Sequence, residues 1–413
     1  MSKVSIIGAY NTKFGQFVEL NTAREFIRDT KTIYELLVEA GKGAMDDAGV
    51  SPKDIDAIYV GSCSPSMFAN QEHVAPLALL ISDDFRFKHT TRTEGACASS
   101  SVALYNAVMA IESGRFNNIL VIGVEKMNRL ATPAMTHTLA CSSFFPEEGR
   151  KGVSFPMLFA MYGKGYKEQY KLSDADFEKM LAAVGAHCYK NGAKNPIAQV
   201  QNGPDTIDKI LAMNKPDDKG KIKNAMVAPP LRLHDCSLVS DGAAALVITK
   251  TENAKNKKKA VEIAGFGIST EFMPMSKKPN HYKAEGAIDA FQKACKEAGV
   301  TINDIQVAEV HDCFTINQIV LTEALGLAKD GKGGFDYIDG KFGANDKCGV
   351  NLSGGLKSKG HPVGATGASM HVHVYRQLIG EPLGEKKEAE MGAIVNVGGS
   401  NVTNCASVLR RIK

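Results

Sequence analysis

The chain has 413 residues, of which 44% are apolar and 23% charged, and its formal net charge is +4. This length predicts two or three domain-sized units, and the small net charge argues against a nucleic-acid partner. The sequence contains no apolar run of about 18 residues, so we expect no membrane-spanning helix and no membrane partner.

The nine cysteines are widely spaced, and no two of them form a Cys-x-x-Cys pair. No signal-peptide pattern follows Met1, because Lys3 leads directly into the apolar segment 4–8. Both observations predict a protein of the reducing cytoplasm with free thiols. They also argue against a zinc site formed by this chain, and we expect no bound metal.

A segment that occurs twice is the strongest sign of how the chain is organised. Residues 44–63, AMDDAGVSPKDIDAIYVGSC, align without a gap with residues 294–313, ACKEAGVTINDIQVAEVHDC. In each copy a helix ends at Ala-Gly, a short turn follows, and an apolar strand comes next. A glycine after the last helical turn is the usual C-cap, and short apolar strands are typical of parallel sheets covered on both faces. We therefore predict a duplicated α/β fold.

Cys97 lies among small residues in EGACASSS (94–101), immediately before the helical pattern of residues 102–108. This spacing predicts a thiol at a helix N-terminus, where the helix dipole and free backbone N–H groups favour a thiolate. Small neighbours leave room for a substrate carbonyl. Taken alone, the segment is equally consistent with a buried structural cysteine, the usual role of a free thiol.

Two further pairs of strands continue the duplication. Residues 118–123 and 393–398 each follow a helix and read as a buried strand, and residues 241–249 and 404–411 read as the last strand of each half. Helices are expected on both faces of each sheet.

These patterns predict an N-terminal half over residues 1–127 plus 232–255 and a C-terminal half over residues 260–413. Residues 128–231 have no counterpart in the second half, and we predict that they form an inserted loop domain. The charged run 255–259 is interpreted as a solvated linker.

Within the inserted segment the sequence predicts helices over about 155–170 and 173–190. The apolar residues of 155–162 either line an acyl pocket or form the core of the loop domain. We favour the core.

Two histidines lie in segments typical of active sites. His311-Asp312-Cys313 ends the repeated strand of the second half, and catalytic groups gather at strand ends in open α/β sheets. His361 belongs to the glycine-rich segment GGLKSKGHPVGATGA (354–368), whose glycines let a ligand approach closely. A phosphate-binding P-loop is the rival interpretation, but the Gly-Lys-Ser/Thr ending is absent at the required spacing.

A thiol with two imidazoles is suited to nucleophilic catalysis by sulfur. One imidazole can take the proton of Cys97, and a second thiol or imidazole can move protons to or from carbon or sulfur. Backbone N–H groups at helix starts can hold an oxyanion. This combination predicts acyl transfer through a thioester rather than phosphoryl or hydride transfer.

With these motifs the chain resembles the thiolase superfamily over nearly its whole length, and it is most similar to the sterol-carrier-protein-type thiolases and their archaeal and bacterial relatives. The motifs follow in family order: EGACAS (94–99), PLRLHDCS (230–237), SDGAAA (240–245), HDCF (311–314), GHPVGATG (360–367) and NVGG (396–399). The resemblance implies a duplicated thiolase fold in five layers, αβαβα, with an inserted loop domain. It also implies coenzyme A as a substrate and no covalently bound cofactor.

The resemblance further implies roles for individual residues. Cys97 would be the acylated nucleophile, and His361 would activate it and line the oxyanion hole for the thioester carbonyl. His311 would share that hole. The backbone N–H groups of Cys97 and Gly398 would form a second oxyanion hole for the acyl-enzyme.

The chain departs from the common thiolases at two linked places. Those enzymes carry Asn-Glu-Ala-Phe or His-Glu-Ala-Phe in place of HDCF, and a second catalytic cysteine in Cys-x-Gly where this chain has Asn396-Val397-Gly398. We therefore expect the acid/base thiol at Cys313, as in the sterol-carrier type. Cys405 and Cys63 are interpreted as structural.

The implied reaction is thiolytic cleavage of a 3-ketoacyl-CoA or the reverse Claisen condensation. Another condensing enzyme, of the ketoacyl synthase or hydroxymethylglutaryl-CoA synthase type, is the first alternative, and a non-catalytic subunit or lipid-binding scaffold is the second. The resemblance implies a homodimer or a dimer of dimers. Some relatives act only with a small zinc-ribbon/OB-fold protein, which leaves open a catalytic chain that needs such a partner.

Overall fold

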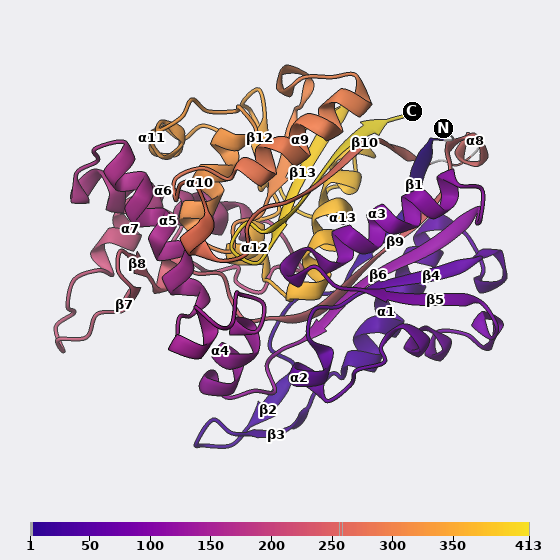
Figure 1. The fold of residues 1–413 in the computed structure, drawn as a ribbon, viewed down its shortest axis with the longest axis horizontal. Helices are drawn as coiled ribbons and strands as arrows, with labels where there is room; N and C mark the ends of the chain where they lie inside the picture. Colours follow the sequence, from indigo (N-terminus) through magenta and orange to yellow (C-terminus); the bar gives the residue numbers. More distant parts are fainter. Residues whose placement is uncertain (1–2, 256, 258, 413) are drawn as a thin grey trace.

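One ten-stranded mixed sheet runs through the molecule in the computed structural model, which describes residues 3–255, 257 and 259–412 (Figure 1). The strand order is β12-β11-β13-β14-β10-β1-β9-β6-β4-β5. In chain order these strands are β1 (Val4–Asn11), β4 (Ala57–Gly61), β5 (His89–Thr93), β6 (Asn118–Lys126), β9 (Asp241–Lys250), β10 (Val261–Thr270), β11 (Val307–Val310), β12 (Gly349–Val350), β13 (Met391–Gly398) and β14 (Thr403–Arg411).

The sheet consists of two matching sets of strands. The first set has the order β5-β4-β6-β9-β1; β4 pairs parallel with both of its neighbours, and the other pairs are antiparallel. The second set has the order β12-β11-β13-β14-β10, in which β11 takes the place of β4 and the pairing pattern is the same. The sets meet where β1 pairs antiparallel with β10, with Val4 opposite Ile263. The predicted strands 118–123, 241–249, 393–398 and 404–411 lie in β6, β9, β13 and β14, which confirms them.

Helices complete five layers, as expected. Helix α1 covers β1, β6 and β9 on one outer side, and α9 covers β10 and β14 on the other, while α3 and α13 pack against each other between the two sets of strands. The helices are α1 (Ile33–Ala48), α2 (Pro65–Ala69), α3 (Ser99–Glu112), α4 (Thr132–Ala140), α5 (Phe155–Gln169), α6 (Asp174–Gly192), α7 (Ile207–Ala212), α8 (Thr251–Ala254), α9 (Glu285–Ala298), α10 (Thr315–Ala324), α11 (Gly333–Ile338), α12 (Gly355–Lys359) and α13 (Thr366–Leu378).

The two copies of the repeated segment fold alike. Helices α1 and α9 both end in a left-handed glycine, Gly49 at φ 60° and Gly299 at φ 68°, a conformation that glycine adopts at little cost. A 3₁₀ turn follows in each copy, over Pro52–Asp54 and Ile302–Asp304, and leads into β4 and β11. The predicted helix–turn–strand repeat is confirmed.

The segment between β6 and β9 contributes no strand to the large sheet. It contains α4 to α7 and a small hairpin of β7 (Met226–Ala228) and β8 (Leu231–Arg232). A second hairpin, of β2 (Val18–Leu20) and β3 (Phe26–Asp29), follows β1 in the chain. Helices α5, α6 and α7 form a lobe at one side of the molecule (Figure 1). There α6 packs against α10, α11 and α12, so this segment of the first half rests on elements of the second half.

Two remaining expectations concern the linker and the membrane. Lys257 donates to the carbonyl oxygen of Ala48, and Lys259 pairs with Asp47 and Glu381, so these two lysines are held at the surface rather than freely solvated. Asn256 and Lys258, also in the predicted linker, lie outside the described residues. Among the described helices, none combines the length and apolar character needed to cross a bilayer.

Candidate active site

Cys97 sits in a tight turn between β5 and α3. The 3₁₀ turn Ala96–Ala98 leads directly into α3, and Ala96 has a left-handed φ of 51°, a conformation that costs energy for a residue with a Cβ atom. The Ser99 hydroxyl closes the turn: it accepts from the Gly95 N–H at 3.1 Å and donates to the Ala96 carbonyl at 2.6 Å. The thiol is thus held at the start of a helix, as the sequence predicted.

The Cys97 turn lies against the end of β13. A Cβ atom at Gly398 would stand 2.0 Å from the Gly95 carbonyl oxygen, so this close approach requires glycine. The backbone N–H of Gly399 lies near the Cys97 sulfur and lowers the pKa of the thiol. Gly399 adjoins Gly398, whose N–H is the predicted donor to the oxygen of the acyl-enzyme rather than to the sulfur.

The hydrogen bonds around His361 fix its tautomer. The Thr366 hydroxyl donates to the Pro362 carbonyl at 2.9 Å, so at its 2.7 Å contact with His361 Nδ1 it acts as the acceptor. His361 therefore carries its proton on Nδ1. Its Nε2 presents a lone pair, which is what a base for the Cys97 proton needs.

His311 has the opposite tautomer. Asn396 accepts from Ser101 through Oδ1 and donates to the Cys97 carbonyl through Nδ2, at 2.7 and 3.3 Å. The same Nδ2 lies 2.9 Å from His311 Nδ1, which must accept. His311 therefore carries its proton on Nε2, and among the described residues this buried atom has no hydrogen-bond partner. An unpaired buried N–H is costly, and here it is available to a substrate oxygen.

Cys97, His311 and His361 form one cluster. Their ligand atoms all lie within 4.8 Å of one another, and the two rings meet edge to face with centroids 5.0 Å apart. The residue types would suit a zinc ion. The tautomers do not suit a zinc ion. As long as His311 Nδ1 accepts a hydrogen bond from Asn396, Nε2 bears the proton and cannot bind a metal.

Burial sets the charge of this cluster. It raises the pKa of the Cys97 thiol to about 12 against the lowering effect of the Gly399 N–H. Burial, and then the positive charge of Lys359, lowers the pKa of His361 to about 3, and the pKa of His311 falls well below its usual value, chiefly through burial. The resting cluster is thus a neutral thiol with two neutral imidazoles.

A cavity of about 170 Å³ opens onto the Cys97 sulfur. Cys313 lines it, and the negative charge of a Cys97 thiolate raises the pKa of Cys313 after the larger effect of burial. The structure therefore brings together Cys97, Cys313 and His361 at one cavity, with His311 in contact with the cluster. Cys405 is buried within β14 and does not line the cavity.

Most of the cavity wall is apolar. Phe155 and Pro156 belong to it, whereas Phe159 and Tyr162 from the same segment are buried, and Phe159 stacks on Phe314 with centroids 4.6 Å apart. The preferred assignment of this segment to the core thus holds for Phe159 and Tyr162 but not for its first two residues. The remaining lining residues are Cys63, Met127, Leu139, Ser142, Cys236, Ser237, Leu238, Val239, Phe314, Val363 and Gly399.

Sequence reasoning missed Glu125, which lies behind the cavity at the end of β6. Its carboxylate accepts from the backbone N–H groups of Cys63 and Gly364, at 2.7 and 3.1 Å, and so joins loops of the two halves. Burial raises its pKa to about 7. The only signal in the sequence was a charged residue following the apolar strand 118–123.

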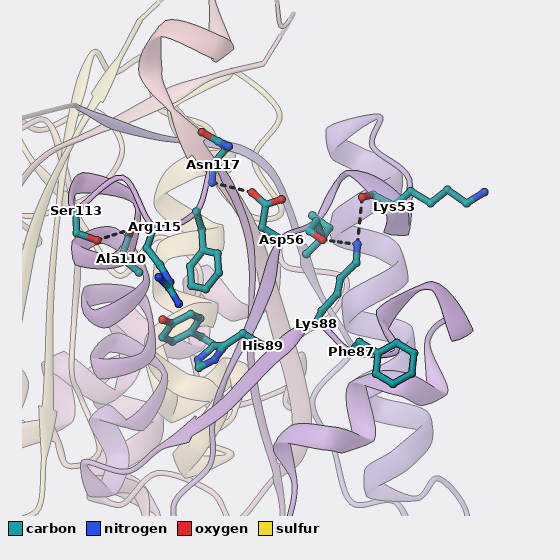
Figure 2. Close-up of a pocket in the computed structure, with 12 residues that line it drawn as sticks. Lys53, Asp56, Phe87, Lys88, His89, Ala110, Ser113, Arg115 and Asn117 are labelled. Atoms are coloured by element: carbon teal, nitrogen blue, oxygen red, sulfur yellow. Dashed lines mark hydrogen bonds between the residues drawn. The ribbon is translucent and has the colours of Figure 1, made fainter.

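A second and larger cavity, of about 790 Å³, is not the candidate site (Figure 2). It adjoins the C-terminal end of α3, whereas Cys97 precedes the N-terminal end, and a helix of 14 residues spans about 21 Å. Two of its charged residues are already occupied: Lys88 donates to backbone carbonyls of Pro52 and Lys53, and Asp56 accepts from the Asn117 N–H.

Comparison with known proteins agrees with this geometry. Residues 4–252 match the family described as thiolase, N-terminal domain, and residues 267–411 match thiolase C-terminal domain-like. The chain is 35% identical to the acetyl-CoA acetyltransferase of Methanothermobacter thermautotrophicus over 415 residues, covering 100% of both chains. It is 29% identical to human sterol carrier protein 2 over 396 residues, covering 92% of this chain and 67% of that protein.

Among solved structures, the Ltp2–ChsH2(DUF35) aldolase matches with a TM-score of 0.80 at 19% identity, covering 99% of this chain and 98% of that one. This likeness shows a shared fold. Together with the family matches over both halves and the full-length relative, it means that the chain belongs to the thiolase family of acyltransferases.

Proposed function

We propose that Cys97 is the nucleophile of a thiolase that transfers an acyl group between the protein and coenzyme A. The observation that carries the proposal is the complementary pair of imidazoles at the sulfur: one nitrogen of each ring lies within 4.8 Å of Cys97 Sγ, and His361 presents a lone pair whereas His311 presents an N–H. A base and a hydrogen-bond donor at one thiol are what thioester chemistry needs.

In the cleavage direction the Cys97 proton moves to His361 Nε2 and the sulfur attacks the 3-keto carbon of the substrate. The bond between C2 and C3 breaks, and its electron pair goes to C2 of the departing acyl-CoA. Cys313 protonates that carbon and becomes a thiolate. The products of this step are acetyl-CoA, or another acyl-CoA where C2 is substituted, and the shortened acyl chain as a thioester on Cys97.

In the second step coenzyme A gives its thiol proton to the Cys313 thiolate, and its sulfur attacks the Cys97 thioester. The new acyl-CoA leaves, and Cys97 recovers the proton held by His361. Protein and protons return to their initial state, and the reverse sequence is a Claisen condensation.

Two oxyanions arise in this cycle. The His311 Nε2–H, with His361, is assigned to the thioester oxygen of the departing acyl-CoA. The oxygen on the carbon bonded to Cys97 is assigned to backbone N–H groups of Cys97 and Gly398. The Gly399 N–H, which lowers the pKa of the Cys97 thiol, supports a donor role for this turn.

The experiment is intact-mass analysis after exposure to a panel of 3-ketoacyl-CoA and acyl-CoA compounds. The wild type should gain the mass of one acyl group at Cys97, and Cys97→Ala should gain none while keeping its fold by circular dichroism. Acylation of the Cys97→Ala variant, or turnover equal to wild type, would contradict the assignment.

Coenzyme A thiolysis separates the alternatives. A thiolase converts acetoacetyl-CoA and free coenzyme A into two acetyl-CoA, whereas a ketoacyl synthase or hydroxymethylglutaryl-CoA synthase gives other products. A lipid-binding scaffold would form no acyl-enzyme. The match to an acetyl-CoA acetyltransferase over the full chain favours the thiolase.

We also propose that the chain divides into an N-terminal half (1–127 plus 232–255), a C-terminal half (260–413) and a loop domain (128–231) inserted in the first half. The loop domain would hold much of coenzyme A. Helices α5 to α7 stand outside the large sheet, and Phe155 reaches the cavity at Cys97, which supports this division. The absence of disulfides among the nine cysteines supports a cytoplasmic location.

Partner proteins form the last part of the proposal. The edge strand β5 pairs only with β4, and nearby Phe87 is 91% exposed; an open edge favours a homodimer across β5. The solved Ltp2 structure contains a DUF35 protein, which supports a zinc-ribbon/OB-fold partner here. Light scattering of the purified chain, and activity with and without a co-expressed partner of that type, test both points.

A further inference from the structure

Lys359 and Glu309 form a buried ion pair behind the active site. Their side chains are 1% and 3% exposed, and Lys359 Nζ lies 3.7 Å from Glu309 Oε2. Among the described residues the ammonium makes no hydrogen bond. A buried pair of this kind contributes little to stability, so its position calls for a functional account.

The pair connects the two segments that present the histidines. Glu309 lies on β11 two residues before His311, and Lys359 ends α12 two residues before His361. Glu309 is itself fixed by Ser353, whose hydroxyl donates to Oε2 at 2.7 Å. One ionic contact thus joins the end of β11 to the loop that carries His361.

We propose that Lys359 is a positioning residue whose ammonium, anchored by Glu309, adds to burial in keeping the imidazoles of both His311 and His361 uncharged. The inference rests on the proposed function, in which His361 must accept a proton and His311 must donate a hydrogen bond. Both tasks need a neutral ring. A positive charge behind the two rings opposes protonation of either one.

The surroundings of the cluster agree with this role. After burial itself, the charge of Lys359 is a cause of the lowered pKa of His361, and it also acts on His311 and on His373 of α13. Cys97 and Cys313 are neutral thiols at rest, with raised pKa values.

Among the other charged groups, Glu125 and Glu94 act on Cys97 and raise the pKa of its thiol, whereas Asp312 and Lys357 are directed elsewhere. The Asp312 carboxylate accepts from the backbone of Leu356 and Lys357 at 2.7 and 3.1 Å. Lys357, also buried, donates to the Cys236 carbonyl at 2.6 Å and acts on His234 rather than on the two catalytic imidazoles.

The test is the pH dependence of thiolysis and of Cys97 alkylation in Lys359→Met. Removing the charge raises the pKa of His361, so the acid limb of kcat/KM should move up by about one pH unit. The thiolate–imidazolium pair should also form more readily. Alkylation of Cys97 by iodoacetamide at pH 7, followed by peptide mass analysis, should therefore be about tenfold faster.

Three variants complete the design. Lys359→Arg keeps the charge and should restore the wild-type acid limb. Lys357→Met removes a buried lysine two residues away and should leave the limb in place. The double variant Glu309→Gln with Lys359→Met leaves no unpaired buried charge, and it should behave as Lys359→Met does and carry the test if the single variant unfolds.

The inference would be overturned if the double variant had the same acid limb and the same alkylation rate as Lys357→Met. Alkylation needs no substrate, so this arm still reports on Lys359 if the wild type transfers no acyl group. A wild-type protein that transfers no acyl group would reject the proposed function and not the role of Lys359.

Discussion

The strand ends at Cys63 and Cys313 occupy matching places in the two halves of the molecule, and both thiols line the cavity at Cys97. The residues just before them differ. The first half has Gly61, where a Cβ atom would stand 2.3 Å from Ser100 Cα, so the strand end makes room for the start of α3. The second half has His311 at that place. The two halves thus have similar backbones at this place. The residue at position 61 serves packing in the first half, and the one at position 311 serves chemistry in the second.

The comparison makes Cys63 the natural control for Cys313. Cys313→Ala should lower thiolysis by about 10³-fold, in the range for loss of a general acid/base, because no other thiol would protonate the departing carbon. Cys63→Ala should keep activity within about threefold, since the Cys63 thiol is held by the hydroxyls of Ser64 and Ser142 and the Glu125 charge also raises its pKa. Steady-state kinetics with acetoacetyl-CoA measures both. Equal losses in the two variants would refute the division of labour.

Substitutions of the two histidines of the second half should have different effects on alkylation of Cys97. His361→Asn and His311→Asn are each expected to lower kcat by about 10²-fold to 10³-fold. Only His361→Asn should also slow alkylation of Cys97, because only His361 presents a lone pair toward the sulfur. Iodoacetamide kinetics beside turnover separate the roles, and an unchanged alkylation rate in His361→Asn would assign the base elsewhere.

Asn396 differs from its counterpart in the same way, since the matching place in β6 is Gly123, where a Cβ atom would stand 2.7 Å from Ser100 Cβ. Asn396→Ala removes the N–H that holds the His311 tautomer, and we expect kcat to fall about tenfold with little change in KM. Nitrogen chemical shifts of His311 should show a mixture of tautomers. A single unchanged tautomer in the variant would show that another contact fixes the ring.

The smallest expected effect concerns stability. Helix α13 buries His371, whose pKa burial lowers to about 4, while the matching helix α3 contains no histidine. The folded state binds fewer protons than the unfolded state below about pH 6.5, so stability decreases as pH falls through that window. His371 should contribute a loss of about 2 kcal/mol between pH 7 and 5. Urea unfolding of wild type and His371→Gln at both pH values measures it, and identical pH slopes would contradict the prediction.

The backbone framework could be predicted because it depends on local patterns. Ala-Gly helix ends, apolar strands and the small residues before α3 placed Cys97, His311 and Cys313 at the ends of elements. Contacts between distant segments could not be read in this way. The Gly399 N–H at the Cys97 sulfur depends on how closely β13 approaches the Cys97 turn, and the tautomer of His311 depends on an amide from another strand. The role of Glu125 as a clamp between halves likewise appears only after folding.

The pairing of β1 has a consequence for how the protein is made. This strand is the first to be synthesised, yet its neighbours are β9 and β10, with Val4 opposite both Lys250 and Ile263. At about 5–20 residues per second, β1 waits on the order of 10–50 s on the ribosome before either partner exists. During that time an apolar strand with two open edges is free to pair wrongly. The seam that unites the two halves therefore cannot form until β10 has been made, and β14, the other neighbour of β10, is made last of all the strands in the sheet.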